Sequence, residues 1–256
     1  MLQAHSFFWH YLWVAPNVLL LLLAFLLWRR GLHRQYPALF AFTILSACAE
    51  LAVYVADVAP SVSANTFWGV DLASLLIEGP LKFVLIAEVF ALVFGAYASL
   101  AELGKLLIRA VGVILVLTAA LAAAYAQQDS LFAIVSGAHL AAQSIYFIES
   151  GLLVFIFLFS AYFNIKPSRP VLGIALGLAV SACIHLATWG IAANSGLPPS
   201  KRVTLDFLNM VAYHICVLIW FYYLLVPGKV AATSAVPLTE NNLGVWNREL
   251  ERLLHQ

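Results

Sequence analysis

Six ionisable side chains lie inside long apolar stretches of the sequence, where a charged group is unusual. They are Glu50, Glu78, Lys82, His139, His185 and His214. If each stretch is a membrane-spanning helix, these residues share one layer, roughly 10 to 12 Å below one membrane surface or a helical turn deeper. An ionised side chain near the bilayer centre costs about 2.5 to 3.5 kcal/mol on insertion scales. The six residues therefore predict a polar, ligand-binding pocket in one half of the protein.

Glu78 and Lys82 are four residues apart, in the order that favours an ion pair along one helix. Pro80 lies between them, where it removes a backbone hydrogen bond and can kink the helix. One interpretation is a self-neutralising pair that helps helices pack. The other is that Lys82 holds the anionic group of a ligand.

Glu88 and Glu149 form a second, sparser layer of carboxylates on the far side of the first. With Glu50 and Glu78 they set four carboxylates against one base, Lys82. Some of the four must be protonated, solvated or bound to a cation. If all were buried as charged groups without partners, the free-energy cost would approach the whole stability of a domain. Neutral glutamic acids hydrogen-bonded across helices are the structural interpretation. Proton or cation handling by Glu88 and Glu149 is the functional one.

The three histidines could ligate zinc, or two of them a haem iron, because neutral imidazole suits both metals. No spacing motif supports either site, so the metal content stays open. His214 is followed four residues later by Leu218, which excludes the His-x-x-x-His pattern of ceramidase-type hydrolases. The last span has no lysine for a retinal Schiff base, and His-Glu-x-x-His, Gly-x-Ser-x-Gly and phosphate-loop motifs are absent. No motif requires a cofactor, and the sequence favours a protein that is not an enzyme.

Seven apolar runs carry these residues, and each is long enough for a helix to cross a bilayer. The chain has 256 residues, of which 64% are hydrophobic and 10% charged, whereas soluble domains carry about 25% charged residues. The predicted spans are Phe7 to Leu27, Pro37 to Val55, Leu72 to Leu100, Leu106 to Tyr125, Leu131 to Phe163, Pro170 to Ala193 and Val203 to Val226. We therefore expect an all-α, polytopic membrane protein whose residues 1–226 form a seven-transmembrane-helix bundle.

The basic residues predict the orientation of this bundle. Ten of the 13 Lys and Arg residues fall in alternate connections, on the side of Arg29. Lys201 and Arg202 lie on the opposite side, and Lys82 lies within a span. The positive-inside rule then places the N-terminus outside and the C-terminus in the cytoplasm, so that the six-residue layer lies in the outer half.

The segment after the seventh span is predicted to hold a linker, residues 227–241, and a short amphipathic helix, residues 242–256. Apolar residues recur there at helical spacing, at Leu243, Trp246, Leu250, Leu253 and Leu254. A helix of about three turns is too short to be stable alone. We expect it to lie on the bilayer, on the underside of the bundle, or on a cytoplasmic partner protein.

Several short segments carry a resemblance to known sequences. They are Arg29-Arg30-Gly31-Leu32-His33-Arg34-Gln35, Glu88-Val89-Phe90 with Tyr97, Ser150 to Ser160 continuing to Gly173 to Gly177, and Trp246-Asn247 with Glu249-Leu250. In these residues the chain resembles a family of bacterial seven-transmembrane-helix proteins of unknown function. The resemblance covers nearly the whole chain. It implies the architecture, in a bacterial inner membrane, and no activity.

Three functions fit this sequence. The first is a non-enzymatic receptor or receptor subunit that responds to a small ligand or to protons through the outer pocket. The second is a proton- or cation-coupled transporter, favoured if the four glutamates line one path. The third is a zinc-dependent intramembrane lipid hydrolase, favoured if two histidines and a carboxylate converge. The lipid bilayer is the expected environment, and a net charge of +1 gives no basic field for nucleic acid.

Overall fold

The structure of the protein, a computed structural model, describes residues 5–95, 102, 104, 106, 109, 110, 113, 131–162, 164–194 and 199–226. For residues 131–142, 192–194, 199 and 200 it describes the backbone alone. The regular secondary structure of this part of the chain is helical. Its elements are α1 (Phe7–Arg29), the 3₁₀ helix η1 (Leu32–Arg34), α2 (Pro37–Val58), α3 (Ala64–Phe94), α5 (Leu131–Tyr162), α6 (Arg169–Asn194) and α7 (Pro199–Leu225). The predicted all-α fold is confirmed.

Local side-chain chemistry sets where several of these helices begin. The Ser6 hydroxyl caps α1 by accepting a hydrogen bond from the Trp9 backbone N–H at 3.3 Å. Ser63 caps α3 in the same way through the N–H of Thr66, at 3.2 Å. Pro37 is the first residue of α2, where the missing N–H has no helical partner to lose. Gly31, between α1 and η1, has a φ of 71°, which glycine adopts without steric cost.

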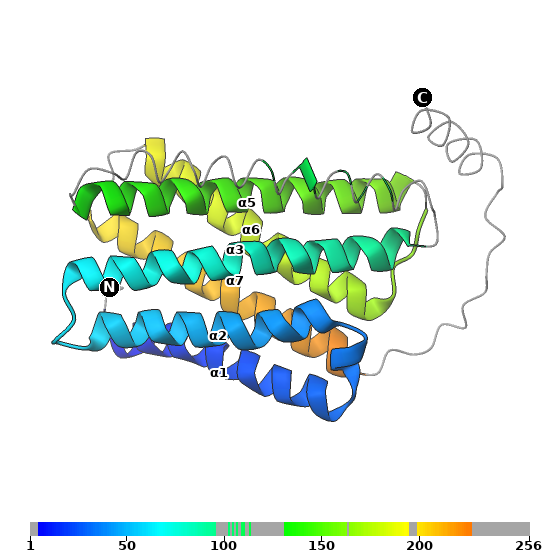
Figure 1. Cartoon of the computed structure of the whole chain (residues 1–256), viewed down its shortest axis with the longest axis horizontal. Coiled ribbons are helices and arrows are strands. Elements are labelled where there is room, and N and C mark those ends of the chain that lie inside the picture. The colour runs from blue at the N-terminus through cyan, green and yellow to red at the C-terminus, as the bar shows by residue number, and fades with distance from the viewer. Residues whose placement is uncertain are drawn as a thin grey trace.

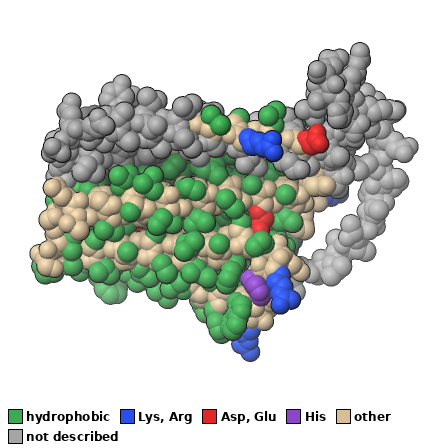
Figure 2. All heavy atoms as spheres, viewed as in Figure 1, with side chains coloured by type: hydrophobic (Ala, Val, Ile, Leu, Met, Phe, Trp, Pro, Cys, Tyr) green, Lys and Arg blue, Asp and Glu red, His purple; other side chains and the backbone are tan. Residues whose placement is uncertain are grey.

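Within the described residues, five helices are long and apolar enough to cross a membrane. They are Phe7–Arg29, Pro37–Val58, Gln143–Tyr162, Arg169–Ile191 and Lys201–Leu225. Figure 2 shows one face of the molecule, on which hydrophobic side chains predominate and Lys, Arg and His side chains gather mainly near the right-hand end. Large exposed side chains such as Phe147 and Leu158 would be unfavourable in water. These features indicate a multi-pass membrane protein whose apolar surface contacts lipid.

The six described α-helices lie side by side along the long axis of the molecule, with α6 and α7 inclined to the others, and close into a ring (Figure 1). Each helix packs on its neighbour in the order α1, α2, α3, α5, α6, α7, and α7 contacts α1 again. Across the ring, α3 also contacts α6. This closure turns one face of every described α-helix toward a common interior.

Large apolar side chains fill the end of the bundle at which α1 ends and α2 begins. This apolar core contains Leu23, Leu27, Leu39, Phe42, Leu85, Ile86, Phe94, Ile156, Ile174 and Trp220. Each of these side chains is at most 2% exposed. Burying one such side chain contributes about 1.5 to 3 kcal/mol relative to exposure to water, and in a bilayer the gain comes chiefly from packing.

Glycine residues of α6 let α7 pack closely against it. A Cβ atom at Gly173 would collide with the Tyr223 side chain, and one at Gly177 with Trp220. The Trp220 indole N–H also donates to the Ile174 carbonyl oxygen at 3.2 Å. Small residues that let backbones approach are the usual device for helix association in lipid.

The predicted spans agree with the helices at most ends, with one clear difference. The third span was predicted from Leu72 to Leu100, whereas α3 begins at Ala64 and ends at Phe94. The apolar run identified the part suited to hydrocarbon, but the Ser63 cap starts the helix two turns earlier. α3 is not among the five most apolar helices and carries Asp71, Glu78, Lys82 and Glu88. The fourth predicted span, Leu106 to Tyr125, lies almost wholly outside the described residues.

Candidate functional site

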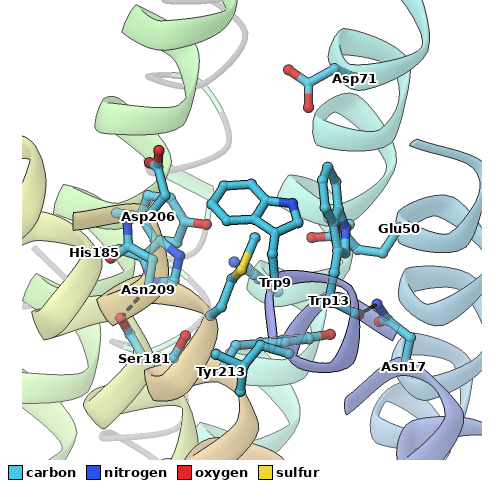
Figure 3. Close-up of a pocket in the computed structure, with 15 residues that line it drawn as sticks. Trp9, Trp13, Asn17, Glu50, Asp71, Ser181, His185, Asp206, Asn209 and Tyr213 are labelled. Atoms are coloured by element: carbon cyan, nitrogen blue, oxygen red, sulfur yellow. Dashed lines mark hydrogen bonds between the residues drawn. The ribbon is translucent and has the colours of Figure 1, made fainter. Parts of the chain in front are cut away.

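A cavity of about 380 Å³ lies in the half of the bundle where α1, α3 and α7 begin. It is lined by Glu50, Glu78, Lys82 and His185, which are four of the six residues predicted to form the polar pocket. Trp9, Trp13, Asn17, Asp71, Asp206 and Asn209 also line it. Figure 3 shows these side chains converging from opposite sides, with the Trp9 ring between Asp206 and Trp13. Every described α-helix contributes to the lining, through Tyr146 in the case of α5.

Lys82 makes its ion pair with Glu149, and not with Glu78 as in the first of the two interpretations of the sequence. The Lys82 Nζ atom lies 3.7 Å from Glu149 Oε2 and 4.4 Å from the centroid of the Tyr146 ring. Both partners are on α5, so the lysine side chain leaves the face of α3 and crosses to the neighbouring helix. The i,i+4 spacing places Glu78 and Lys82 on the same face of α3. The lysine side chain is long enough to reach a carboxylate on the neighbouring helix instead.

Glu78 is held instead by α2. The Ser46 hydroxyl donates to Glu78 Oε1 at 2.6 Å, and its oxygen also lies 3.3 Å from the Tyr213 hydroxyl. A hydrogen bond to a carboxylate of this length is among the strong, charge-assisted kind. Glu78 therefore links α3 to α2 and, through Ser46, to α7.

Glu50 accepts a hydrogen bond from an aromatic side chain of α1. The Trp13 indole N–H donates to Glu50 Oε2 at 3.3 Å. The Trp13 ring stands edge-on to Tyr54, with centroids 5.6 Å apart, and the Tyr54 hydroxyl lies 3.2 Å from His10 Nδ1. Trp13 is thus fixed in the cavity wall by contacts on two sides.

His185 faces the cavity from α6 with a defined tautomer. Its Nδ1 atom lies 2.9 Å from the Ser181 carbonyl oxygen, and a carbonyl accepts only, so Nδ1 carries the proton. The imidazole stacks on Tyr146, with centroids 4.5 Å apart and planes 19° apart. In this neutral form Nε2 keeps its lone pair as an acceptor.

Glu88 lies away from the cavity and caps a helix. Its two carboxylate oxygens accept hydrogen bonds from the backbone N–H groups of Ala38 and Leu39, at 3.0 and 3.3 Å. These groups belong to the first turn of α2, where a helix favours negative charge. The structure therefore separates Glu88 from Glu149, which lies beside Lys82. The two carboxylates predicted as one layer have different surroundings.

The remaining predicted residues lie apart from the cavity or outside the described atoms. His214 contacts the Tyr11 ring, with centroids 5.9 Å apart, and does not line the cavity. The side chain of His139 is outside the described residues, as are Leu243, Trp246, Leu250 and Leu253 of the predicted tail helix. In the part of the chain that is described, no three His, Cys, Asp or Glu side chains are placed to hold a metal ion. A zinc site that includes His139 stays a prediction.

Several lining residues were not identified from the sequence as part of a site. Trp9 and Trp13 lie in an aromatic segment at the start of the first span, which is typical of a membrane-interface anchor. Asn17 and Asn209 are uncharged, so the energetic cost of placing an ionised side chain in the bilayer did not single them out. Asp206 lies in the first turns of α7, too near the end of the span to count as intramembrane charge.

Comparison of the chain with protein-family models, curated proteins and solved structures found no match.

Proposed function

We propose that the protein is a non-enzymatic receptor, or receptor subunit, of a bacterial inner membrane and binds a small ligand in the cavity. The observation that carries this proposal is the division of the bundle into two halves. One half holds a polar cavity lined from every described α-helix. The other is filled by the apolar core. A cavity near the lower end of the usual volume range for ligand sites suits a small molecule.

The proposal includes a seven-helix bundle with its N-terminus outside. Arg29, Arg30 and Arg34 lie at the end of the bundle opposite the cavity, as the positive-inside rule expects of the cytoplasmic side. The Arg30 guanidinium donates to the Leu225 carbonyl oxygen at 3.0 Å, so the end of α7 lies at the same side. α3 and α5 run in the same direction along the bundle (Figure 1), which supports one more crossing between them. The cavity then opens toward the outside.

The apolar core supports a receptor over a transporter. Phe42, Leu85, Ile86 and Trp220 are buried between the cavity and the Glu88 cap of α2. A ligand or ion that entered the cavity would meet closely packed hydrocarbon side chains. Ligand binding would shift the positions of the helices. A cytoplasmic partner protein bound at the predicted tail helix would respond to that shift.

Cysteine labelling tests whether the cavity is an outward-facing, water-accessible site. Met210 lines the cavity, whereas Leu208 on the same helix is exposed on the outside of the bundle. In spheroplasts, Met210→Cys should react with a membrane-impermeant maleimide, and Leu208→Cys should not, because a thiol in lipid forms little thiolate. The wild-type protein corrects for its three native cysteines. Labelling of Met210→Cys only in inverted vesicles, or in neither preparation, would refute the proposed site.

A further inference from the structure

The charges of the cavity argue against an anionic ligand. Its carboxylates are Glu50, Asp71, Glu78 and Asp206. Its one Lys or Arg side chain is Lys82, and that ammonium group is already paired with Glu149 and lies over the Tyr146 ring. Within the described part of the chain, none of the four lining carboxylates forms an ion pair with a basic side chain. An anion entering the cavity would therefore meet four carboxyl groups and no Lys or Arg side chain of the described lining that is free to pair with it.

Aromatic faces make up the other part of the lining. The Trp9 and Trp13 rings are edge-to-face, with centroids 6.0 Å apart and planes at 75°. Two aromatic rings in different orientations thus border one cavity, and Figure 3 shows them side by side. Among aromatic side chains, tryptophan attracts cations most strongly, because its ring face carries negative potential. The Trp13 indole N–H donates to Glu50. This hydrogen bond fixes the edge of the indole, and the ring borders the cavity.

Two buried polar atoms of the lining have no protein hydrogen-bond partner among the described residues. They are Trp9 Nε1, a donor, and Asn17 Oδ1, an acceptor. Trp9 is 9% exposed and Asn17 1% exposed, so neither atom is at the molecular surface. Asn17 is held in place because its amide nitrogen donates to the Trp13 carbonyl oxygen at 2.8 Å. Buried polar atoms without a partner are rare, because each costs about 1 to 3 kcal/mol.

We propose that the ligand of this cavity is a small organic cation, a protonated or quaternary amine that also carries a hydrogen-bond acceptor. This inference rests on the proposed function and names the ligand class for that same site. The ammonium group lies between the Glu50 and Glu78 carboxylates and against the Trp9 and Trp13 rings. An N–H of a protonated amine donates to Asn17 Oδ1, and the acceptor receives the Trp9 indole N–H. A bare metal ion would use the carboxylates and leave the aromatic walls and the Trp9 donor unmatched.

Matched probes of different charge test the ligand class. The probes are 2-amino-1-phenylethanol and choline as cations with a hydroxyl acceptor, 1-phenylethane-1,2-diol as a neutral analogue, 3-hydroxy-3-phenylpropanoate as an anion, and KCl and MgCl₂ as inorganic cations. Binding to the detergent-purified full chain is followed by tryptophan fluorescence and by the unfolding temperature at pH 7. We expect at least one of the two amines to quench fluorescence and raise the unfolding temperature. The neutral and anionic analogues should bind at least tenfold more weakly, since each loses the charge that the carboxylates favour.

Variants locate the binding at this cavity. Glu50→Gln and Glu78→Gln should each weaken amine binding at least tenfold, and Trp9→Leu should weaken it independently of any carboxylate. Asp57→Asn is the matched control, because Asp57 lies on α2 one heptad beyond Glu50 but does not line the cavity. It should bind the amine as the wild-type protein does. The amine should also protect Met210→Cys from the maleimide.

Several outcomes would overturn the inference. They are no response to either amine, stronger binding of the anion or the neutral analogue, a response to K⁺ or Mg²⁺ alone, and an equal loss in Asp57→Asn. If Met210→Cys is labelled from outside but the amines fail, the cavity remains a ligand site and the organic cation is wrong. If Met210→Cys is not labelled, the proposed function itself fails.

Discussion

The ammonium nitrogen of Lys82 lies 3.7 Å from Oε2 of Glu149, so an ion pair joins α3 to α5 inside the bundle. The Glu149 side chain is 1% exposed and that of Lys82 10%. Removing charges from a polar solvent is costly, and such a pair adds little net stability. Breaking it is different, because one charge is then left buried without a partner. This pair occupies the Lys82 ammonium group, and among the described residues the carboxylates that line the cavity form no ion pair.

The Lys82 and Glu149 pair predicts a specific pattern in double variants. Lys82→Met should lower the free energy of unfolding by about 3 to 5 kcal/mol, because Glu149 loses its partner. Lys82→Met with Glu149→Gln should recover most of this loss. Lys82→Met with Glu78→Gln should not, since Glu78 is already held by Ser46. SDS-induced unfolding in detergent micelles measures the three values, and a better rescue by Glu78→Gln would favour the pair predicted from the sequence.

Glu88 is predicted to stabilise the first turn of α2. Its carboxylate accepts two backbone hydrogen bonds at the helix N-terminus, so Glu88→Ala should cost about 1 to 2 kcal/mol. Glu88→Gln keeps one carbonyl acceptor and should cost less. Glu102→Gln, at an exposed position, is the control and should have no measurable effect. Unfolding of these variants in detergent checks the order, and amine binding should persist in Glu88→Gln because the residue does not line the cavity.

The α6 and α7 interface predicts a difference between two glycines of one helix. A side chain at Gly177 would collide with Trp220, whereas a Cβ at Gly190 meets no atom of the described residues within 4 Å. Gly177→Ala should destabilise the protein by about 1 to 3 kcal/mol through overpacking. Gly190→Ala should be neutral or stabilising, because alanine favours helix over glycine by about 1 kcal/mol. Thermal unfolding in detergent compares them, and equal effects would contradict the packing of Trp220 on α6.

The proposed orientation predicts the location of three reporter fusions. Fusions after Gln35, Ala126 and Gln256 should report inside, outside and inside, respectively, because the basic residues of the connections favour the cytoplasm. Alkaline phosphatase is active outside and green fluorescent protein inside, so paired fusions give opposite signals at each point. A reversed signal after Gln35 would place the cavity on the cytoplasmic side. A reversed signal after Ala126 alone would contradict the seven-helix count.

The sequence predicted most of the helices and where polar residues occur along them. Helix formation depends on hydrogen bonds between residues four apart and on apolar length, and both are local properties that one sequence contains. The start of α1 at Phe7 and of α2 at Pro37 followed from the first apolar residue or a proline. The start of α3 at Ala64 was missed because a serine cap extends the helix into a more polar segment.

The partners of the buried polar side chains were decided by tertiary structure. The sequence placed Lys82 next to Glu78, but which carboxylate it reaches depends on the rotation and spacing of α3, α2 and α5, and these are set by packing between helices. The same packing turns Glu88 toward the first turn of α2 and places Trp9 and Asn17 in the same cavity as Glu50. In one sequence an uncharged amide or an aromatic residue does not indicate a polar cavity. The closed ring of helices brings such residues together in one cavity.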